Sequence, residues 1–156
     1  MEELRSEMGA GASAIAGIVS DVSEKLPGLA APLELEPEQA RFRLFDAITA
    51  FLKNASRRQP LVLVLDDLHW ADHPSLLLLE FMARELAGHR ILVIGTYRDM
   101  ELSRRHPLSL TLGELNRERL FQRVLLRGLA REDVGRFIEL VSGMAPPSVC
   151  RCKRGN

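Results

Sequence analysis

The sequence lacks any long apolar run and is poor in cysteine. No stretch approaches the roughly 20 apolar residues that a membrane helix needs, so we expect no membrane span. The first residues, Met1-Glu-Glu-Leu-Arg, are acidic and precede no apolar core, which argues against a secretory leader. Cys150 and Cys152 form a C-x-C pair without a nearby histidine, so we expect reduced, inert thiols. These absences predict a cytoplasmic protein.

Net charge is also absent, because 21 Lys and Arg residues balance 21 Asp and Glu residues. Composition alone therefore gives no reason to expect binding to nucleic acid or to a membrane. The charge is uneven, since residues 103–156 contain eleven basic and five acidic residues. Such a basic half could face a polyanion such as a triphosphate, but it is more often a set of solvated helix faces. We expect no nucleic-acid-binding element.

What the chain does contain is enough apolar material for one globular domain: 46% of its 156 residues are hydrophobic and 27% are charged. Residues 1–30 are rich in Gly and Ala and predict a soft helical arm, either a helix with close packing contacts or a poorly ordered segment. Residues 31–145 form the predicted core. Residues 146–156 predict a disordered basic tail.

Periodicity and punctuation within the core predict alternating strands and helices. A helix that begins at Pro37 has one apolar face, which we expect to pack on a sheet. Strands are predicted at 61–65, 91–94 and 121–126, and helices at 74–88, 107–119 and 132–141. The four consecutive leucines at 76–79 suggest contacts on more than one side of their helix. This order predicts an α/β fold with a parallel sheet flanked by helices.

The most informative stretch is the apolar run Leu61-Val-Leu-Val-Leu65, which ends in Asp66 and Asp67. Five uninterrupted apolar residues are typical of a strand buried on both faces. Acids at the carboxyl end of a parallel strand lie where open α/β sheets bind ligands. Such a pair can hold Mg²⁺, usually through water, and can orient a nucleophile. We therefore expect Asp66 on the magnesium side and Asp67 to polarise an attacking water; the simpler alternative is a solvated strand end.

Two polar residues follow the neighbouring predicted strand. Thr96 and Arg98 offer a hydroxyl and a guanidinium at the same edge of the sheet, and Arg is a natural planar partner for phosphate oxygens. They are candidates for sensing a γ-phosphate. The alternative for Arg98 is an ion pair with Asp99 or Asp72.

The residues around the acidic pair have simpler expected roles. We expect His69 to be a structural hydrogen-bonder, Trp70 to be a packing anchor and Asp72 to cap the following helix. Arg104-Arg105-His106 is predicted to be a solvated loop.

Five blocks of the sequence together resemble the signalling ATPases of the STAND type, an AAA-like module of bacterial LuxR-type regulators and some adenylate cyclases. The resemblance covers residues 20–145. The blocks occur in the order that such modules show: Glu38-Gln-Ala-Arg-Phe-Arg-Leu-Phe45, Asp66-Asp-Leu-His-Trp-Ala-Asp72, Gly95-Thr-Tyr-Arg-Asp99, His106-Pro-Leu108 and Leu126-Arg-Gly-Leu129.

The resemblance implies a partial P-loop-NTPase-like sheet, with ATP and Mg²⁺ as ligands. It makes Asp66 and Asp67 the Walker-B pair that serves magnesium and water. Thr96 or Arg98 would sense the γ-phosphate. The implied function of the parent protein is ATP-dependent signalling or control of transcription.

The sequence departs from the family at the phosphate-binding loop, G-x-x-x-x-G-K-[ST]. No such loop is present, and the three lysines are Lys25, Lys53 and Lys153. Without backbone amides and a lysine to hold phosphates, Mg-nucleotide lacks a cradle. We therefore expect an internal fragment of a larger ATPase, with little or no hydrolysis by itself and with open sheet edges that invite self-association.

Two other classes of protein remain as alternatives. One is a non-catalytic protein-interaction module that kept the fold and lost nucleotide chemistry. The other is a phosphoacceptor receiver domain, which also clusters Asp residues at strand ends. A receiver needs a Lys on a late strand and a separate acceptor Asp, and the sequence shows neither in place.

Overall fold

Two parallel strands, β1 (Leu61–Leu65) and β2 (Ile91–Gly95), carry the first two apolar runs of the predicted core. The structure is a computed structural model that describes residues 2–30 and 35–143. Contacts divide the chain into two units, 1–122 and 123–156, each of which is considered by itself. The predicted tail at 146–156, with both cysteines, lies outside the described residues.

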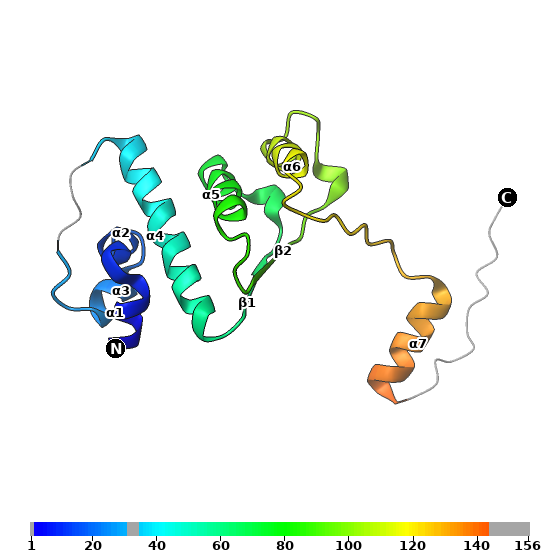
Figure 1. Ribbon diagram of the computed structural model, residues 1–156. Coiled ribbons are helices and arrows are strands. Elements are labelled where there is room, and N and C mark those ends of the chain that lie inside the picture. Colours follow the sequence, from blue (N-terminus) through cyan, green and yellow to red (C-terminus); the bar gives the residue numbers. More distant parts are fainter. Residues whose placement is uncertain (1, 31–34, 144–156) are drawn as a thin grey trace. The chain divides into compact units, whose positions relative to one another are not determined.

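The strands pair in parallel and in simple register, from Leu61 opposite Ile91 to Leu65 opposite Gly95. Within the described part of the chain, the sheet consists of these two strands. Helix α5 (His73–Glu85) connects them, as Figure 1 shows. The predicted fold class, α/β with a parallel sheet flanked by helices, is confirmed.

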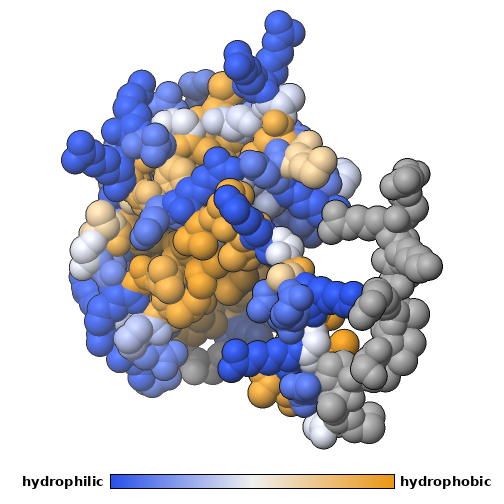
Figure 2. All heavy atoms as spheres, turned by 90° about the vertical axis from the view of Figure 1, so that its right-hand side faces the viewer, coloured by the Kyte–Doolittle hydropathy of each residue, from blue (hydrophilic) through white to orange (hydrophobic). Residues whose placement is uncertain are grey.

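The expectation that the strands are buried on both faces is wrong. Odd-numbered residues of β1 are half-buried, whereas Val62 and Val64 are 61% and 63% exposed. Their neighbours Leu92 and Ile94 on β2 are exposed as well. Side chains alternate between the two faces of a strand, so one face of this pair is covered and the other faces outward. The space-filling view shows apolar side chains gathered on an exposed surface (Figure 2).

Helix α4 (Pro37–Arg58) begins at a proline, as predicted. Its principal neighbours are α5 and three short N-terminal elements: α1 (Glu2–Met8), the 3₁₀ turn η1 (Gly9–Gly11) and α2 (Ala12–Ala16). The apolar face of α4 thus packs mainly on helices, and the expectation that it packs on the sheet is wrong. Phe45 contacts Phe81 of α5 with ring centroids 6.0 Å apart.

The small residues near the N-terminus permit a close helix contact. A Cβ at Gly11 would lie 2.7 Å from the Cβ of Ala47 on α4, closer than real carbon atoms approach. The same region forms an apolar cluster with α3 (Ser20–Lys25) and the residue that follows it. Its buried members are Met8, Ala12, Ile15, Val22, Leu26 and Ala47.

Helices α5 and α6 (Pro107–Arg117) pack against each other. The α5 leucines at 76–79 are all at least partly buried, which confirms that this helix is covered on more than one side. Leu76 and Leu108 are the most deeply buried side chains of the pair, at 1% and 0% exposure. Arg84 of α5 also makes a bidentate ion pair with Glu118.

The predicted third strand at 121–126 is wrong, because those residues form no strand in the structure. An apolar run becomes a strand only where a neighbour pairs with its backbone, and none does so here among the described residues. The predicted last helix is confirmed as α7 (Arg131–Ser142). The backbone N–H of Ala130 donates to Asp133 at its start, and Gly143 ends it with a positive φ of 67°.

Candidate functional site

Asp66 and Asp67 form a sharp turn at the carboxyl end of β1. Asp67 adopts the left-handed conformation, with φ 53° and ψ 44°, which Asp tolerates better than most residues. The chain then enters a 3₁₀ turn, η2 (Leu68–Trp70). The side chain of Asp67 is 52% exposed, and Asp66 is exposed too. Both carboxylates face water, so burial does not force a cation onto them.

Thr96, the first residue after β2, holds this turn in place. Its hydroxyl accepts a hydrogen bond from the backbone N–H of Asp67 at 3.0 Å and donates one to Oδ1 of Asp66. Its backbone N–H donates to the carbonyl of Leu65 at 2.9 Å, and its carbonyl accepts from the N–H of Leu68 at 2.8 Å. The residue that follows β2 therefore organises the acidic turn after β1.

Gly95 makes this close approach possible. A Cβ at this position would lie 2.5 Å from Cδ1 of Leu68, so the leucine occupies the space that a side chain would need. Glycine is required here by the packing of Leu68 and not by the backbone conformation, because the φ of Gly95 is not positive.

Arg98 lies near the turn but is paired with a residue that sequence reasoning missed. Its guanidinium Nη1 lies 3.3 Å from Oε1 of Glu101 in the 3₁₀ turn η3 (Asp99–Glu101). Its backbone N–H donates to Nδ1 of His69 at 3.4 Å. No sequence motif points to Glu101; the i, i+3 spacing from Arg98 is the signal that could have found it.

His69 is buried, with a side chain 1% exposed, and it acts as a hydrogen-bond acceptor as expected. Trp70 was expected to be a packing anchor, and this is wrong because it is 78% exposed. The indole lies against the imidazole, with ring centroids 5.5 Å apart, and leaves most of its own surface in solvent.

Asp72 caps α5, which confirms its predicted role. Its side chain accepts a hydrogen bond from the N–H of Ser75 at 2.9 Å. Hydrogen bonds from the Ser75 hydroxyl and N–H hold the pKa of Asp72 below its usual value. His106, expected in a solvated loop, instead caps α6, because its Nδ1 accepts from the N–H of Leu108 at 3.2 Å. Arg104 and Arg105 are exposed, as predicted.

A magnesium site is not complete in these residues. Among the described residues, no group of three or more His, Cys, Asp or Glu side chains is arranged to hold a metal. Mg²⁺ in nucleotide sites takes one or two carboxylates and draws its other ligands from phosphates and water. Asp66 can supply one such carboxylate, but the sequence has no loop to hold the phosphates. The residues present therefore supply one side of a Mg-nucleotide site and no cradle for its phosphates.

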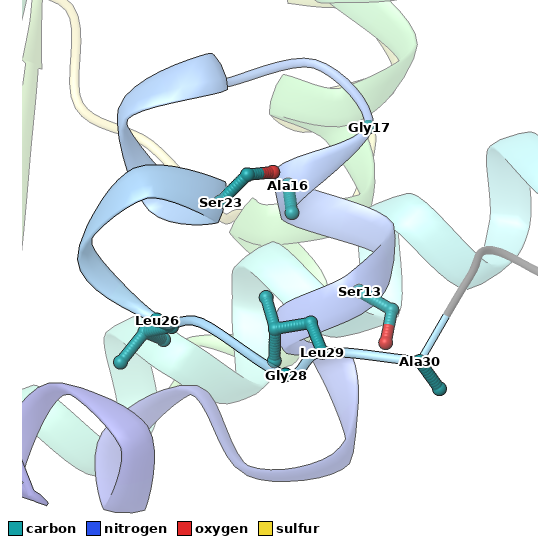
Figure 3. A pocket seen from close by; sticks show the side chains of 8 residues that line it. All are labelled: Ser13, Ala16, Gly17, Ser23, Leu26, Gly28, Leu29 and Ala30. Carbon is teal, nitrogen blue, oxygen red and sulfur yellow. The ribbon is translucent and has the colours of Figure 1, made fainter.

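A hollow of about 250 Å³ lies elsewhere, among α2, α3 and the segment that follows α3 (Figure 3). Its lining contains no charged residue, and the hydroxyls of Ser13 and Ser23 are its side-chain polar groups. The lining therefore offers no Lys or Arg to neutralise a phosphate. Its residues are Ser13, Ala16, Gly17, Ser23, Leu26, Gly28, Leu29 and Ala30.

Comparison with protein families matches residues 3–94 to the AAA ATPase domain. The chain belongs to this AAA ATPase family. The match includes β1, the acidic turn and most of β2, so the parallel pair is part of a P-loop-NTPase-like fold. AAA domains in general use a nucleotide and Mg²⁺, and membership disfavours the receiver-domain alternative. Neither the curated proteins nor the solved structures contain a match to this chain. Within the described ranges, each AAA-domain helix is too short or too polar to cross a bilayer.

Proposed function

We propose that this AAA domain belongs to a STAND-type signalling ATPase and supplies the Walker-B and sensor half of its ATP site. The parent would use ATP binding to drive signalling or to control transcription. The observation that carries the proposal is the hydroxyl of Thr96, which joins Asp66 and the backbone of Asp67 across two parallel strands. The hydroxyl links the turn after β1 to the segment after β2, at the edge of the sheet where α/β folds bind ligands.

The proposed roles follow from these positions. Asp66 would hold Mg²⁺ through water, and Asp67 would polarise the attacking water. Thr96 or Arg98 would respond to the γ-phosphate, with Arg98 offering a planar guanidinium that is 69% exposed. The chain alone supplies no phosphate cradle, so we expect it to release little or no phosphate from ATP.

Two measurements test this function. In NMR titrations, millimolar Mg-ATP should shift the amides of Asp66, Asp67 and Thr96, and Asp66→Asn should weaken the response. Asp46→Asn, at an exposed position on α4, serves as the matched control. An unchanged spectrum at the two turns would refute the nucleotide role. In phosphate-release assays, robust turnover that Asp67→Ala abolishes would refute the view that this chain holds only half of the site.

The alternative is a non-catalytic interaction module, and the exposed sheet face favours it. Val62, Val64, Leu92 and Ile94 present a row of apolar side chains on strands whose outer edges have no described partner strand. The partner we propose is a second copy of the chain that pairs at an edge and covers this apolar face. Sedimentation should then show a dimer that Val64→Lys dissociates, while Leu110→Lys, at an exposed position on α6, leaves it intact. A monomer at all concentrations would refute self-association, and tight Mg-ATP binding by calorimetry would count against a non-catalytic role.

A further inference from the structure

His69 is a buried polar side chain between the two turns of the candidate site. It lies in η2, directly after the acidic turn, and its side chain is 1% exposed. Its Nδ1 faces the backbone N–H of Arg98 at 3.4 Å. Because a backbone N–H can only donate, Nδ1 must be the unprotonated nitrogen. In the neutral ring, the proton therefore lies on Nε2.

The protonated nitrogen faces two carboxylates. Nε2 lies 3.2 Å from Oε2 of Glu101 and 3.8 Å from Oδ1 of Asp67. The Asp67 oxygen is too far for a hydrogen bond and the Glu101 oxygen is poorly aligned, so Nε2 is a buried donor without a bond among the described residues. A buried donor without an acceptor is costly, and Glu101, whose side chain is 40% exposed, is free enough to turn toward it.

Glu101 extends this contact to the guanidinium of Arg98. One of its carboxylate oxygens faces His69 and the other lies 3.3 Å from Nη1 of Arg98. The imidazole therefore touches Arg98 in two ways, directly at the backbone and through Glu101 at the side chain. The same imidazole follows Asp67 by two residues in the chain.

We propose that His69 is a positioning residue that joins the acidic turn after β1 to the Arg98 loop after β2. Nδ1 holds the backbone of Arg98, and Nε2–H orients Glu101, which holds the guanidinium. The importance of Arg98 rests on the proposed ATPase function. The proposed link does not require nucleotide, so the two can be tested separately.

The first test is the tautomer of His69 in the full chain, read from the nitrogen-15 resonances of its ring. We expect a single tautomer with the proton on Nε2, whereas a solvent-exposed histidine averages between its two tautomers. The signals are assigned with a His69→Gln variant, since the chain has four histidines. A proton on Nδ1, or an averaged signal, would overturn the proposal.

The second test separates the two nitrogens with two conservative variants. His69→Asn places an acceptor near the position of Nδ1, so it should keep the Arg98 amide protected from hydrogen exchange but move the carboxyl carbon resonance of Glu101. His69→Gln places a donor near Nε2, so it should keep the Glu101 resonance but speed exchange at the Arg98 amide about three- to tenfold, as for one lost hydrogen bond.

A residue that only fills space predicts a different result. Both variants would then alter both readouts equally, or neither, and either outcome refutes the positioning role. Protection of the amides in β1 and β2 checks that each variant is folded. The Mg-ATP titration is independent of these readouts, so failure of the link and failure of the ATPase function are distinguishable.

Discussion

Replacing Thr96 with valine removes the hydroxyl that organises the acidic turn while keeping a β-branched side chain of similar shape. The hydroxyl makes two hydrogen bonds, accepting from Asp67 N–H and donating to Asp66 Oδ1. The backbone bonds of Thr96 to Leu65 and Leu68 do not involve the hydroxyl. The substitution therefore acts on the acidic turn and not on the pairing of the strands.

The magnitude follows from these two bonds. A hydrogen bond contributes about 0.5–1.5 kcal/mol net, and the exposure of Thr96 and both acids places each bond in the lower half of that range. The loss should then be about 1–2 kcal/mol for local opening of the turn. This corresponds to about a five- to thirtyfold faster exchange of the Asp67 amide with solvent.

Hydrogen exchange followed by NMR measures this effect residue by residue. The Leu68 amide, which donates to the carbonyl of Thr96, should keep its protection and serves as the internal control. Thr96→Ser retains a hydroxyl and should remain close to the wild type. Unchanged protection of Asp67 in Thr96→Val would refute the proposed organisation of the turn. An equal loss at Leu68 would show that the hydroxyl stabilises the whole loop.

Three further substitutions test the packing and the cap. Gly95→Ala should lower the free energy of unfolding by about 1–3 kcal/mol, and a double-mutant cycle with Leu68→Ala by urea denaturation should show that removing the leucine relieves the strain. Gly11→Ala should lower the free energy of unfolding at least as much, because the Cβ of Ala47 on α4 cannot rotate away from the added methyl group. Thermal melts measure this effect, and an unchanged melting temperature would contradict the close contact. The hydrogen bonds that lower the pKa of Asp72 stabilise the fold when the pH is above the pKa of an unfolded Asp. This stabilisation is lost as the pH falls through the lower pKa of the folded state. Asp72→Asn should therefore be less stable than wild type at neutral pH and equal to it in strong acid, whereas a constant difference in urea titrations would refute the linkage to Ser75.

Local signals were sufficient to predict the two observed strands, the starts of the helices and the cap at Asp72. Each depends on residues within one turn or one strand, such as the apolar run before Asp66 and the proline at the first turn of α4. The approach of Thr96 to the acidic turn was also predictable, because parallel strands end at the same edge of a sheet.

What the sequence did not reveal depends on neighbours distant in the chain. The run at 121–126 has the composition of a strand, but it pairs with no strand in the described structure. Trp70 is apolar enough for a core, yet it is 78% exposed. Glu101 belongs to no motif and becomes relevant only because η3 brings it to both His69 and Arg98.

The register of the sheet has a consequence for how the chain folds. Every paired residue of β1 lies thirty positions before its partner on β2, as Leu61 and Ile91 illustrate. Closing a loop of this length costs conformational entropy before any ladder bond forms. During synthesis, the acidic turn therefore emerges from the ribosome well before the threonine that shapes it. The hydrogen bond from the Asp67 N–H to the Thr96 hydroxyl can form only after both strands have been made, so the acidic turn lacks this support until then.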